Sequence, residues 1–289
     1  MRKIGFVTSE VDPELIADDR LAIPFLNQYG FSVDPVVWDS PSIQIADFDL
    51  LIFRSCWNYH RKYPEFLTFL DRVKKSQVPV YNPIETIQWN LNKKHILEFD
   101  GKIAVPRTKW IENRRFFAED VLEKTLSEWN VNQLVVKPAV SLSGHDTYLI
   151  DRLDFAKINL IIRELLKERD VLIQEYIPEI KTEGEISLIF FNRAFSHAIR
   201  KVPAKNEFRI HQEYGGERFP IEASTESISY GKKLLEHVSG KLLYARVDIV
   251  ETKSGPVLIE LEVTDPMLFL GNSDLAAKRF ADAIVELRI

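Results

Sequence analysis

The chain has 289 residues, of which 45% are hydrophobic and 28% charged, and its formal net charge is −5. These proportions are typical of a globular protein, and the negative charge, with no cluster of Lys or Arg, argues against a nucleic-acid partner. The single cysteine, Cys56, excludes an internal disulfide, and no apolar run approaches the ~20 residues needed to cross a membrane. We therefore expect a cytoplasmic protein that has no membrane partner.

Short apolar strands alternate with helices in the first part of the chain. The pattern predicts strands at 3–8, 32–38, 48–53 and 78–81, with helices at 13–29 and 63–76. This alternation is typical of a parallel α/β layer. A further helix is predicted at 84–99, leading away from that layer.

The pattern changes after residue 105, where strands become more frequent. We predict strands at 108–110, 134–137, 147–150, 171–176, 185–191, 194–202, 243–250 and 257–263, and helices at 118–128, 155–168, 224–239 and 275–287. Boundaries near residues 84 and 175 divide the chain into three domains, 1–84, 85–175 and 176–289. The fold class is therefore α/β followed by α+β.

Three carboxylates mark the last two strands. Glu260 and Glu262 share one face of their strand because side chains alternate, and a hairpin can bring Asp248 to that face. Converging carboxylates repel one another and lose hydration, unless a hard divalent cation lies between them. Oxygen ligands suit Mg²⁺ or Mn²⁺, and Mg²⁺ usually arrives with phosphates. The sequence therefore predicts a Mg-nucleotide site.

Phosphates also need cations or backbone N–H groups, and no glycine-rich phosphate-binding motif of the P-loop or dinucleotide-binding type is present. Lys137 ends an apolar strand and precedes a loop of small residues at 139–145, and Lys93 lies early in the helical stretch 90–99. At the end of the third predicted strand, Arg54 and Ser55 stand where open α/β sheets bind ligands. We expect these two residues to contact substrate, with Trp57 and Tyr59 as walls.

The order of these motifs resembles the ATP-grasp superfamily. It runs from Asn-x-x-Lys through Val-Val-Lys-Pro, Gln-Glu-Tyr-Ile-Pro and a basic strand to Val-Asp-Ile and Ile-Glu-Leu-Glu. Residues 202–209 with the Gly-Gly pair at 215–216 resemble the branch of glutathione synthetase and the ribosomal-protein glutamate ligase. The stretch at 54–60 and Pro-x-Leu-Phe-Leu at 266–270 are similar to the subgroup of the D-cycloserine-forming ligase. The resemblance implies an ATP-grasp fold with a Rossmann-like N-terminal substrate domain, a lid over 85–175 and a Mg-ATP sheet over 176–289.

The resemblance also implies roles for individual residues. Lys93 and Lys137 would contact the ATP phosphates, beneath a loop that includes Ser143 and Gly144. The hinge would be Gln174, Glu175, Tyr176 and Ile177, where Glu175 and the following backbone read the adenine. Glu185 would hold the ribose, Arg200 and Arg209 would face the γ-phosphate and an acyl phosphate, and Asp248, Glu260 and Glu262 would bind Mg²⁺. Lys94 competes with Lys93, and Glu183 with Glu185; many family members also carry Asn where Glu262 stands.

The implied function is ATP-dependent ligation of a carboxylate to an amine on a small amino-acid-like substrate, with release of ADP and phosphate. A cyclising reaction is a specific form of it, and the resemblance leaves room for a homodimer. A rival function is that of a ligase that adds an amino acid to a polypeptide, for which the basic stretch at 200–205 could serve an acidic partner. The motifs are also compatible with a non-catalytic nucleotide-binding module, or with a carbohydrate- or nucleotide-binding α/β protein whose resemblance is coincidental.

Overall fold

The computed structural model describes residues 2–205 and 207–287 and contains three sheets. The first is parallel, in the order β2-β1-β3-β4, and consists of β1 (Arg2–Thr8), β2 (Phe31–Val37), β3 (Leu50–Ser55) and β4 (Val80–Tyr81). The predicted helix at 13–29 is instead two short helices, α1 (Ala17–Arg20) and α2 (Ile23–Gln28). The amphipathic α3 (Tyr63–Ser76) covers this sheet through Phe66, Phe69 and Leu70.

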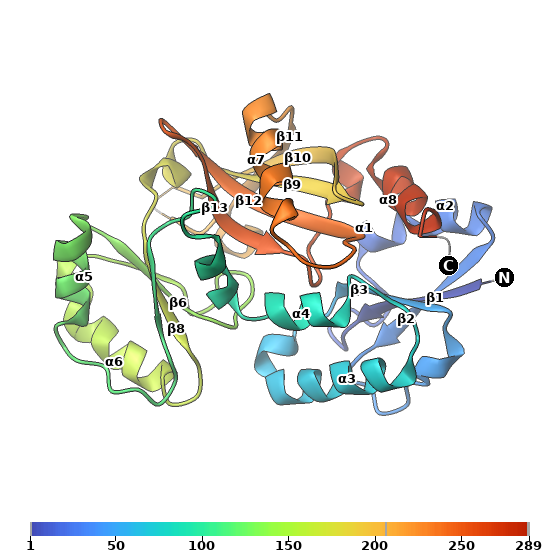
Figure 1. The fold of residues 1–289 in the computed structure, drawn as a ribbon, viewed down its shortest axis with the longest axis horizontal. Coiled ribbons are helices and arrows are strands. Elements are labelled where there is room, and N and C mark those ends of the chain that lie inside the picture. The colour runs from blue at the N-terminus through green and yellow to red at the C-terminus, as the bar shows by residue number, and fades with distance from the viewer. Residues whose placement is uncertain (1, 206, 288–289) are drawn as a thin grey trace.

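The second sheet is antiparallel and has the order β5-β8-β6-β7. Its strands are β5 (Thr108–Ile111), β6 (Leu134–Pro138), β7 (Tyr148–Ile150) and β8 (Val171–Glu175). Two helices, α5 (Val121–Trp129) and α6 (Phe155–Leu165), pack their apolar faces against it around Leu126, Ile162 and Val136. In Figure 1 this unit lies at the end of the molecule opposite the first sheet.

The third sheet lies between the other two and has the order β11-β10-β9-β12-β13 (Figure 1). It consists of β9 (Glu185–Phe191), β10 (Ala194–Val202), β11 (Glu217–Ile221), β12 (Tyr244–Thr252) and β13 (Gly255–Glu262). The edge strand β11 was not predicted. Alternate residues of β9 divide between two faces: Leu188 packs against α7 (Thr225–Glu236), and Ile189 against α8 (Ala276–Val285).

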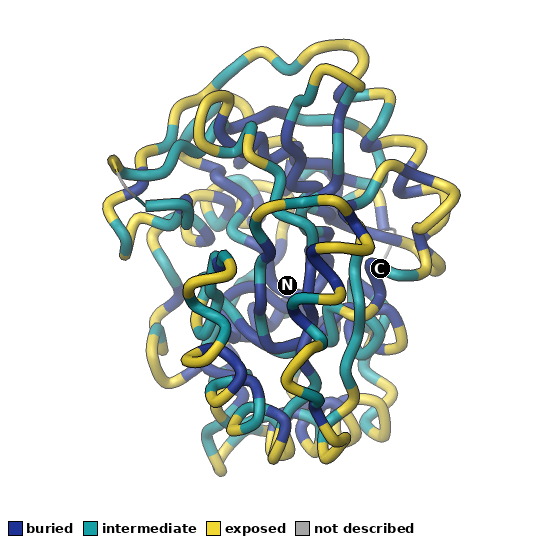
Figure 2. The backbone as a smooth tube through the Cα atoms, turned by 90° about the vertical axis from the view of Figure 1, so that its left-hand side faces the viewer, coloured by how far each residue is buried: buried dark blue, intermediate teal, exposed yellow. Residues whose placement is uncertain are grey.

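Figure 2 shows buried chain running through the interior and exposed chain at the outer turns. The connection between the first and second sheets is α4 (Ile84–Asn90), followed by a 3-10 helix at Lys93–Phe99, where one helix over 84–99 was predicted. No helix in the described residues has the length and apolar character needed to cross a membrane.

Candidate active site

A cavity of about 380 Å³ opens between the second and third sheets and reaches Trp57 from the first domain. This volume lies within the range of small-molecule sites. Most residues predicted from the sequence line it: Trp57, Lys93, Lys137, Ser143, Gly144, Gln174, Glu175, Tyr176, Ile177, Glu185, Arg209, Glu260 and Glu262. The structure thus brings together residues that are up to 205 positions apart, from Trp57 to Glu262.

Three of the four predicted substrate residues are instead internal. Arg54 has no exposed surface and donates from Nε and Nη2 to Asp19 Oδ1, at 3.0 and 2.9 Å. Ser55 is buried against the Thr8 hydroxyl, and the ring of Tyr59 stacks on Phe66. The prediction of substrate contact is therefore wrong for Arg54, Ser55 and Tyr59 in this conformation. Burial between the sheet and neighbouring elements leaves them no surface for a ligand.

The basic strand β10 presents Lys201 to the cavity, whereas Arg200 does not line it. The reason is alternation along the strand, because Arg200 shares its face with Ala198, which packs in the α7 cluster. The predicted position of Arg200 beside the phosphates is therefore wrong, and its neighbour Lys201 occupies that face.

The strand pair β12–β13 has the register that the sequence predicted for its carboxylates. Asp248 pairs with Glu260 and Arg246 with Glu262, so all four side chains share one face. Asp248 is nevertheless buried beneath the lining, where it accepts hydrogen bonds from Ser187, Arg246 and Lys201. Only Glu260 and Glu262 of the three carboxylates reach the cavity wall.

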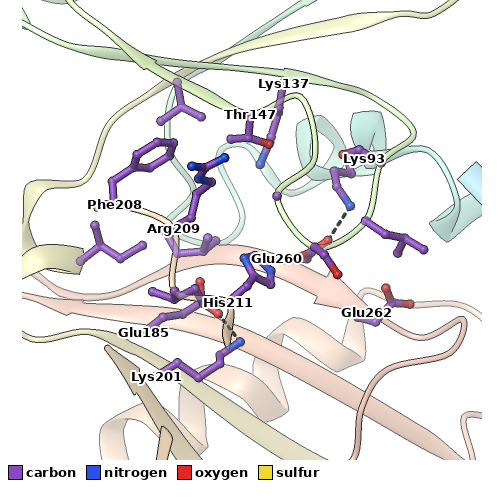
Figure 3. A pocket seen from close by; sticks show the side chains of 18 of the residues that line it. Lys93, Lys137, Thr147, Glu185, Lys201, Phe208, Arg209, His211, Glu260 and Glu262 are labelled. Carbon is purple, nitrogen blue, oxygen red and sulfur yellow. Dashed lines mark hydrogen bonds and ion pairs between the residues drawn. The ribbon is translucent and has the colours of Figure 1, made fainter. Parts of the chain in front are cut away.

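Figure 3 shows Lys93 facing Glu260 across the cavity, whereas Lys201 and Glu185 come from neighbouring strands of the third sheet. Lys93 Nζ lies 2.6 Å from Glu260 Oε1, and Lys201 Nζ contacts both Glu185 and Asp248. Burial acts to raise the pKa of Glu260, but the charges of Lys93 and Arg246 outweigh it and hold that pKa well below its usual value. Glu260 is therefore ionised at neutral pH.

For two pairs of neighbouring residues, the structure distinguishes the member that faces the cavity. Lys94 is exposed, with its ammonium 3.5 Å from the ring centre of Trp110, while Lys93 lines the cavity. Glu183 is exposed, while Glu185 is buried in the cavity wall. Lys93 and Glu185 are therefore the members of each pair that a bound ligand could meet.

The hinge segment connects the second sheet to the third through residues 174–177. The Gln174 amide donates to the Thr108 hydroxyl at 3.0 Å. Glu175 accepts two hydrogen bonds of 2.9 Å from Arg107, and this pairing lowers its pKa. The carboxylate of Glu175 thus already has a cationic partner, so an adenine there would depend on the lining backbone.

The donor set for a divalent cation is made of carboxylate oxygens, which are ligands that Mg²⁺ and Mn²⁺ accept. Glu262 has no Lys or Arg in ion-pair contact within the described part of the chain, and accepts only from the backbone N–H groups of Thr264 and Asp265. Burial and the adjacent charge of Glu260 raise its pKa. A cation beside Glu260 and Glu262 would relieve the repulsion between the two carboxylates, so these residues fit Mg²⁺. Among the described residues, no three side chains of His, Cys, Asp or Glu lie close enough together to hold a metal ion by themselves.

Several lining residues were not predicted from the sequence: Lys201, Arg246, Arg218 and Asp265. Strand alternation alone could have found Arg246, which lies two residues before Asp248 on the same face. Asp265 and Arg218 had no such signal, because one lies in an irregular loop and the other on the strand that was missed.

Residues 116–271, more than half of the chain, match the family model of the ATP-grasp domain of prokaryotic glutathione synthetase. Residues 4–82 match the model of the N-terminal domain of the D-cycloserine synthetase DcsG. The chain therefore belongs to the ATP-grasp family, and it is an ATP-grasp ligase that forms C–N bonds. The predictions of family, fold class and enzymatic activity are confirmed.

Among curated proteins, the chain is 26% identical to the cycloserine biosynthesis protein DcsG of Streptomyces lavendulae, over 98% of each sequence. It is 24% identical to the glutathione synthetase of Rhodopseudomonas palustris, over 82% of this chain and 73% of that one. The crystal structure of D-cycloserine synthetase DcsG superposes with a TM-score of 0.88 at 23% identity, covering 99% of each chain. A RimK-domain ATP-grasp protein of Sphaerobacter thermophilus superposes with a TM-score of 0.71 at 18% identity, covering 98% of this chain and 99% of that one.

Proposed function

We propose that the chain joins a carboxylate to an amine on a small amino-acid-like substrate by way of an acyl phosphate. The observation that carries this proposal is a single cavity lined by cations from the second domain and by the carboxylates Glu260 and Glu262 from the third. A carboxylate is a poor acyl donor, and phosphorylation supplies a leaving group. In the first step a substrate oxygen attacks the γ-phosphorus of ATP, and the bond to the β-phosphate oxygen breaks.

The chain's own residues would bind and orient the reactants. The hinge backbone at 174–177 would hold the adenine, Lys93 and Lys137 the triphosphate, and the loop at 141–146 would exclude water. Mg²⁺, held by Glu260 and Glu262, supplies charge neutralisation when bound. Lys201, Arg209 and Arg246 would stabilise negative charge on the transferred phosphoryl group.

In the second step the amine attacks the acyl carbon, inorganic phosphate leaves, and the nitrogen loses a proton. The amine can belong to a second molecule or to the same one, in which case the product is a ring. The likeness to a cycloserine biosynthesis protein over nearly the whole chain supports the cyclising form. The size of the cavity supports a small acceptor, and a polypeptide acceptor is the second candidate because neighbouring folds include PsnB complexed with its precursor peptide.

The test is release of ADP by the purified protein with Mg-ATP. We would compare pools of amino acids, dipeptides, longer peptides, and ureido- or hydroxylamine-type serine derivatives. Glu260→Gln should lower pool-dependent ADP release by about 100-fold or more, the loss typical when a residue that stabilises transition-state charge is removed. Glu236→Gln, exposed on α7, is the control and should match the wild type. Stimulation by the longer peptides alone would favour the polypeptide acceptor, and no stimulation by any pool would contradict the proposal.

A further inference from the structure

The cationic side chains of the cavity differ in whether an internal carboxylate already neutralises them. Lys93 pairs with Glu260, Lys201 with Glu185, Arg209 with Glu207, and Arg246 with Asp248. Two lining cations, Lys137 and Arg218, have no ion pair with a carboxylate in the portion of the chain that the structure describes. An uncompensated cation in a partly buried wall is a site for an anion supplied by a ligand.

These two cations lie at different parts of the cavity. Lys137 belongs to β6, beside the hinge strand β8, where the nucleotide is proposed to bind. Arg218 belongs to the edge strand β11 and contacts the loop that follows β13, where Nη1 lies 3.0 Å from Met267 Sδ. Its guanidinium carbon also lies 5.4 Å from the ring centre of Phe269. The triphosphate would neutralise the charge of Lys137, but Arg218 would still have no anionic partner.

The wall that carries Arg218 is fixed on both sides. On the sheet, Arg218 pairs directly with Lys201 across the two strands. Directly paired residues project from the same face, so both side chains point to the cavity. On the loop, Pro266 O accepts from Arg54 Nη2 at 2.9 Å, and Leu268 O lies 2.9 Å from His197 Nε2. Thioether sulfur is a weak acceptor, so most of the five N–H donors of Arg218 are still available.

Trp57 closes this part of the cavity from the first domain. Its indole N–H donates to Asp265 O at 3.1 Å, one residue before Pro266. Trp57 and Arg218 therefore both contact the loop at 265–269. A substrate bound here would meet residues of the first and the third domain. Arg54, which the sequence predicted to contact substrate, and Arg209, which it predicted to face an acyl phosphate, are already paired with Asp19 and Glu207.

We propose that Arg218 is the residue that recognises a carboxylate of the amino-acid-like substrate through charge-assisted, bidentate hydrogen bonds. This assignment rests on the proposed ligase function and deepens it. A planar guanidinium suits a carboxylate better than a point charge does, so lysine should replace it only in part. Hydrogen bonds to a charged group contribute about 1.5–3 kcal/mol, which corresponds to a roughly 10- to 100-fold change in affinity.

The experiment compares wild type, Arg218→Lys and Arg218→Met, with Arg115→Met as a control, because Arg115 is exposed and pairs with Glu112 away from the cavity. Calorimetry with Mg-ADP present would measure binding of serine and alanine, in both configurations, and of their carboxamides. We expect the wild type to prefer the acids, Arg218→Met to bind them about 10- to 100-fold more weakly and to lose that preference, and Arg218→Lys to fall between. Affinity for Mg-ADP itself should stay within about twofold.

Steady-state kinetics with whichever acid stimulates ADP release adds a second readout. Arg218→Met should raise the KM of the acid and leave kcat and the KM of ATP nearly unchanged. An equal acid-to-amide preference in wild type and Arg218→Met, a selective effect on ATP, or no binding of any acid by the wild type would overturn the assignment. If no pool stimulates ADP release, the proposed function fails, while the calorimetric comparison still decides the role of Arg218.

Discussion

At the scale of the residue, Lys137 is the cation whose charge is most sensitive to its surroundings. Burial and the charge of Lys93 together lower its pKa to about 8, against the opposing effect of the Glu260 carboxylate. Near neutral pH the side chain still carries its proton, and a bound triphosphate would raise its pKa by favouring the charged form.

This environment predicts a pH dependence of nucleotide binding. Below pH 8 Lys137 is charged with or without the nucleotide, so the affinity for the nucleotide is at its maximum. Above pH 8 the free protein must take up a proton to bind, and affinity falls by up to about tenfold per pH unit until the pKa of the complex is passed. In Lys137→Arg the guanidinium stays protonated, which should flatten the profile.

Calorimetry with a non-hydrolysable ATP analogue between about pH 7 and 9.5 measures this effect. Lys94→Arg is the matched control, since Lys94 lies on Trp110 outside the cavity and its replacement should keep the wild-type profile. The same slope in wild type and Lys137→Arg would show that another group controls the dependence.

Most of the residues singled out from the sequence line the cavity, because strand order and alternation carry the information. Lys137, Glu260 and Glu262 end or alternate along strands whose partners are fixed by the sheet. Arg54 could not be placed in this way. A polar residue at a strand end can face solvent or a buried partner, and the partner here is Asp19, 35 residues earlier.

At the scale of the element, the helix at 84–99 shows how tertiary bonds override a helical pattern. The Asn90 amide donates to Leu261 O and accepts from Val263 N, each at 2.8 Å. The next turn cannot continue, because Asn92 has extended backbone and its side chain accepts from Lys94 N. These bonds join segments about 170 residues apart, so no local pattern reveals them.

The connection into β11 depends on Gly216. A Cβ at this position would lie 2.2 Å from Ile210 O. The N–H of Gly216 donates to His211 O at 3.1 Å, which holds the turn in place. We predict that Gly216→Ala forces the turn apart, costs about 1–3 kcal/mol of stability, and weakens substrate binding by displacing Arg218.

Denaturant unfolding and the KM of the acid substrate measure both parts of this prediction. Gly271→Ala is the control, because the nearest atom to its added Cβ is a side-chain methyl of Leu21 at 3.3 Å, which can move more readily than backbone. If Gly216→Ala were as stable as Gly271→Ala and kept the wild-type KM, the turn would not be setting the position of β11.

At the scale of the whole molecule, the three sheets are joined by buried polar contacts as well as by apolar packing. Asn82 donates to the backbone oxygens of Tyr244 and Val263, and its own oxygen accepts from Leu243 N. Arg54 connects β3 to Pro266, and its guanidinium lies over the rings of Tyr244 and Phe280. The first domain is therefore held against the sheet that carries the proposed nucleotide site.

The Arg54–Asp19 pair predicts how strongly this junction contributes to folding. Asp19→Asn would leave the Arg54 charge buried without its carboxylate, at a cost of about 3–5 kcal/mol in the free energy of unfolding measured with urea. The double variant Asp19→Asn, Arg54→Met should regain part of that loss, because no buried charge remains. The surface pair Lys74–Glu85 supplies the control, and Glu85→Gln should change stability far less. If Asp19→Asn had the stability of Glu85→Gln, Arg54 would have to be satisfied by water or by a rearranged partner, and its exclusion from the substrate site would no longer follow.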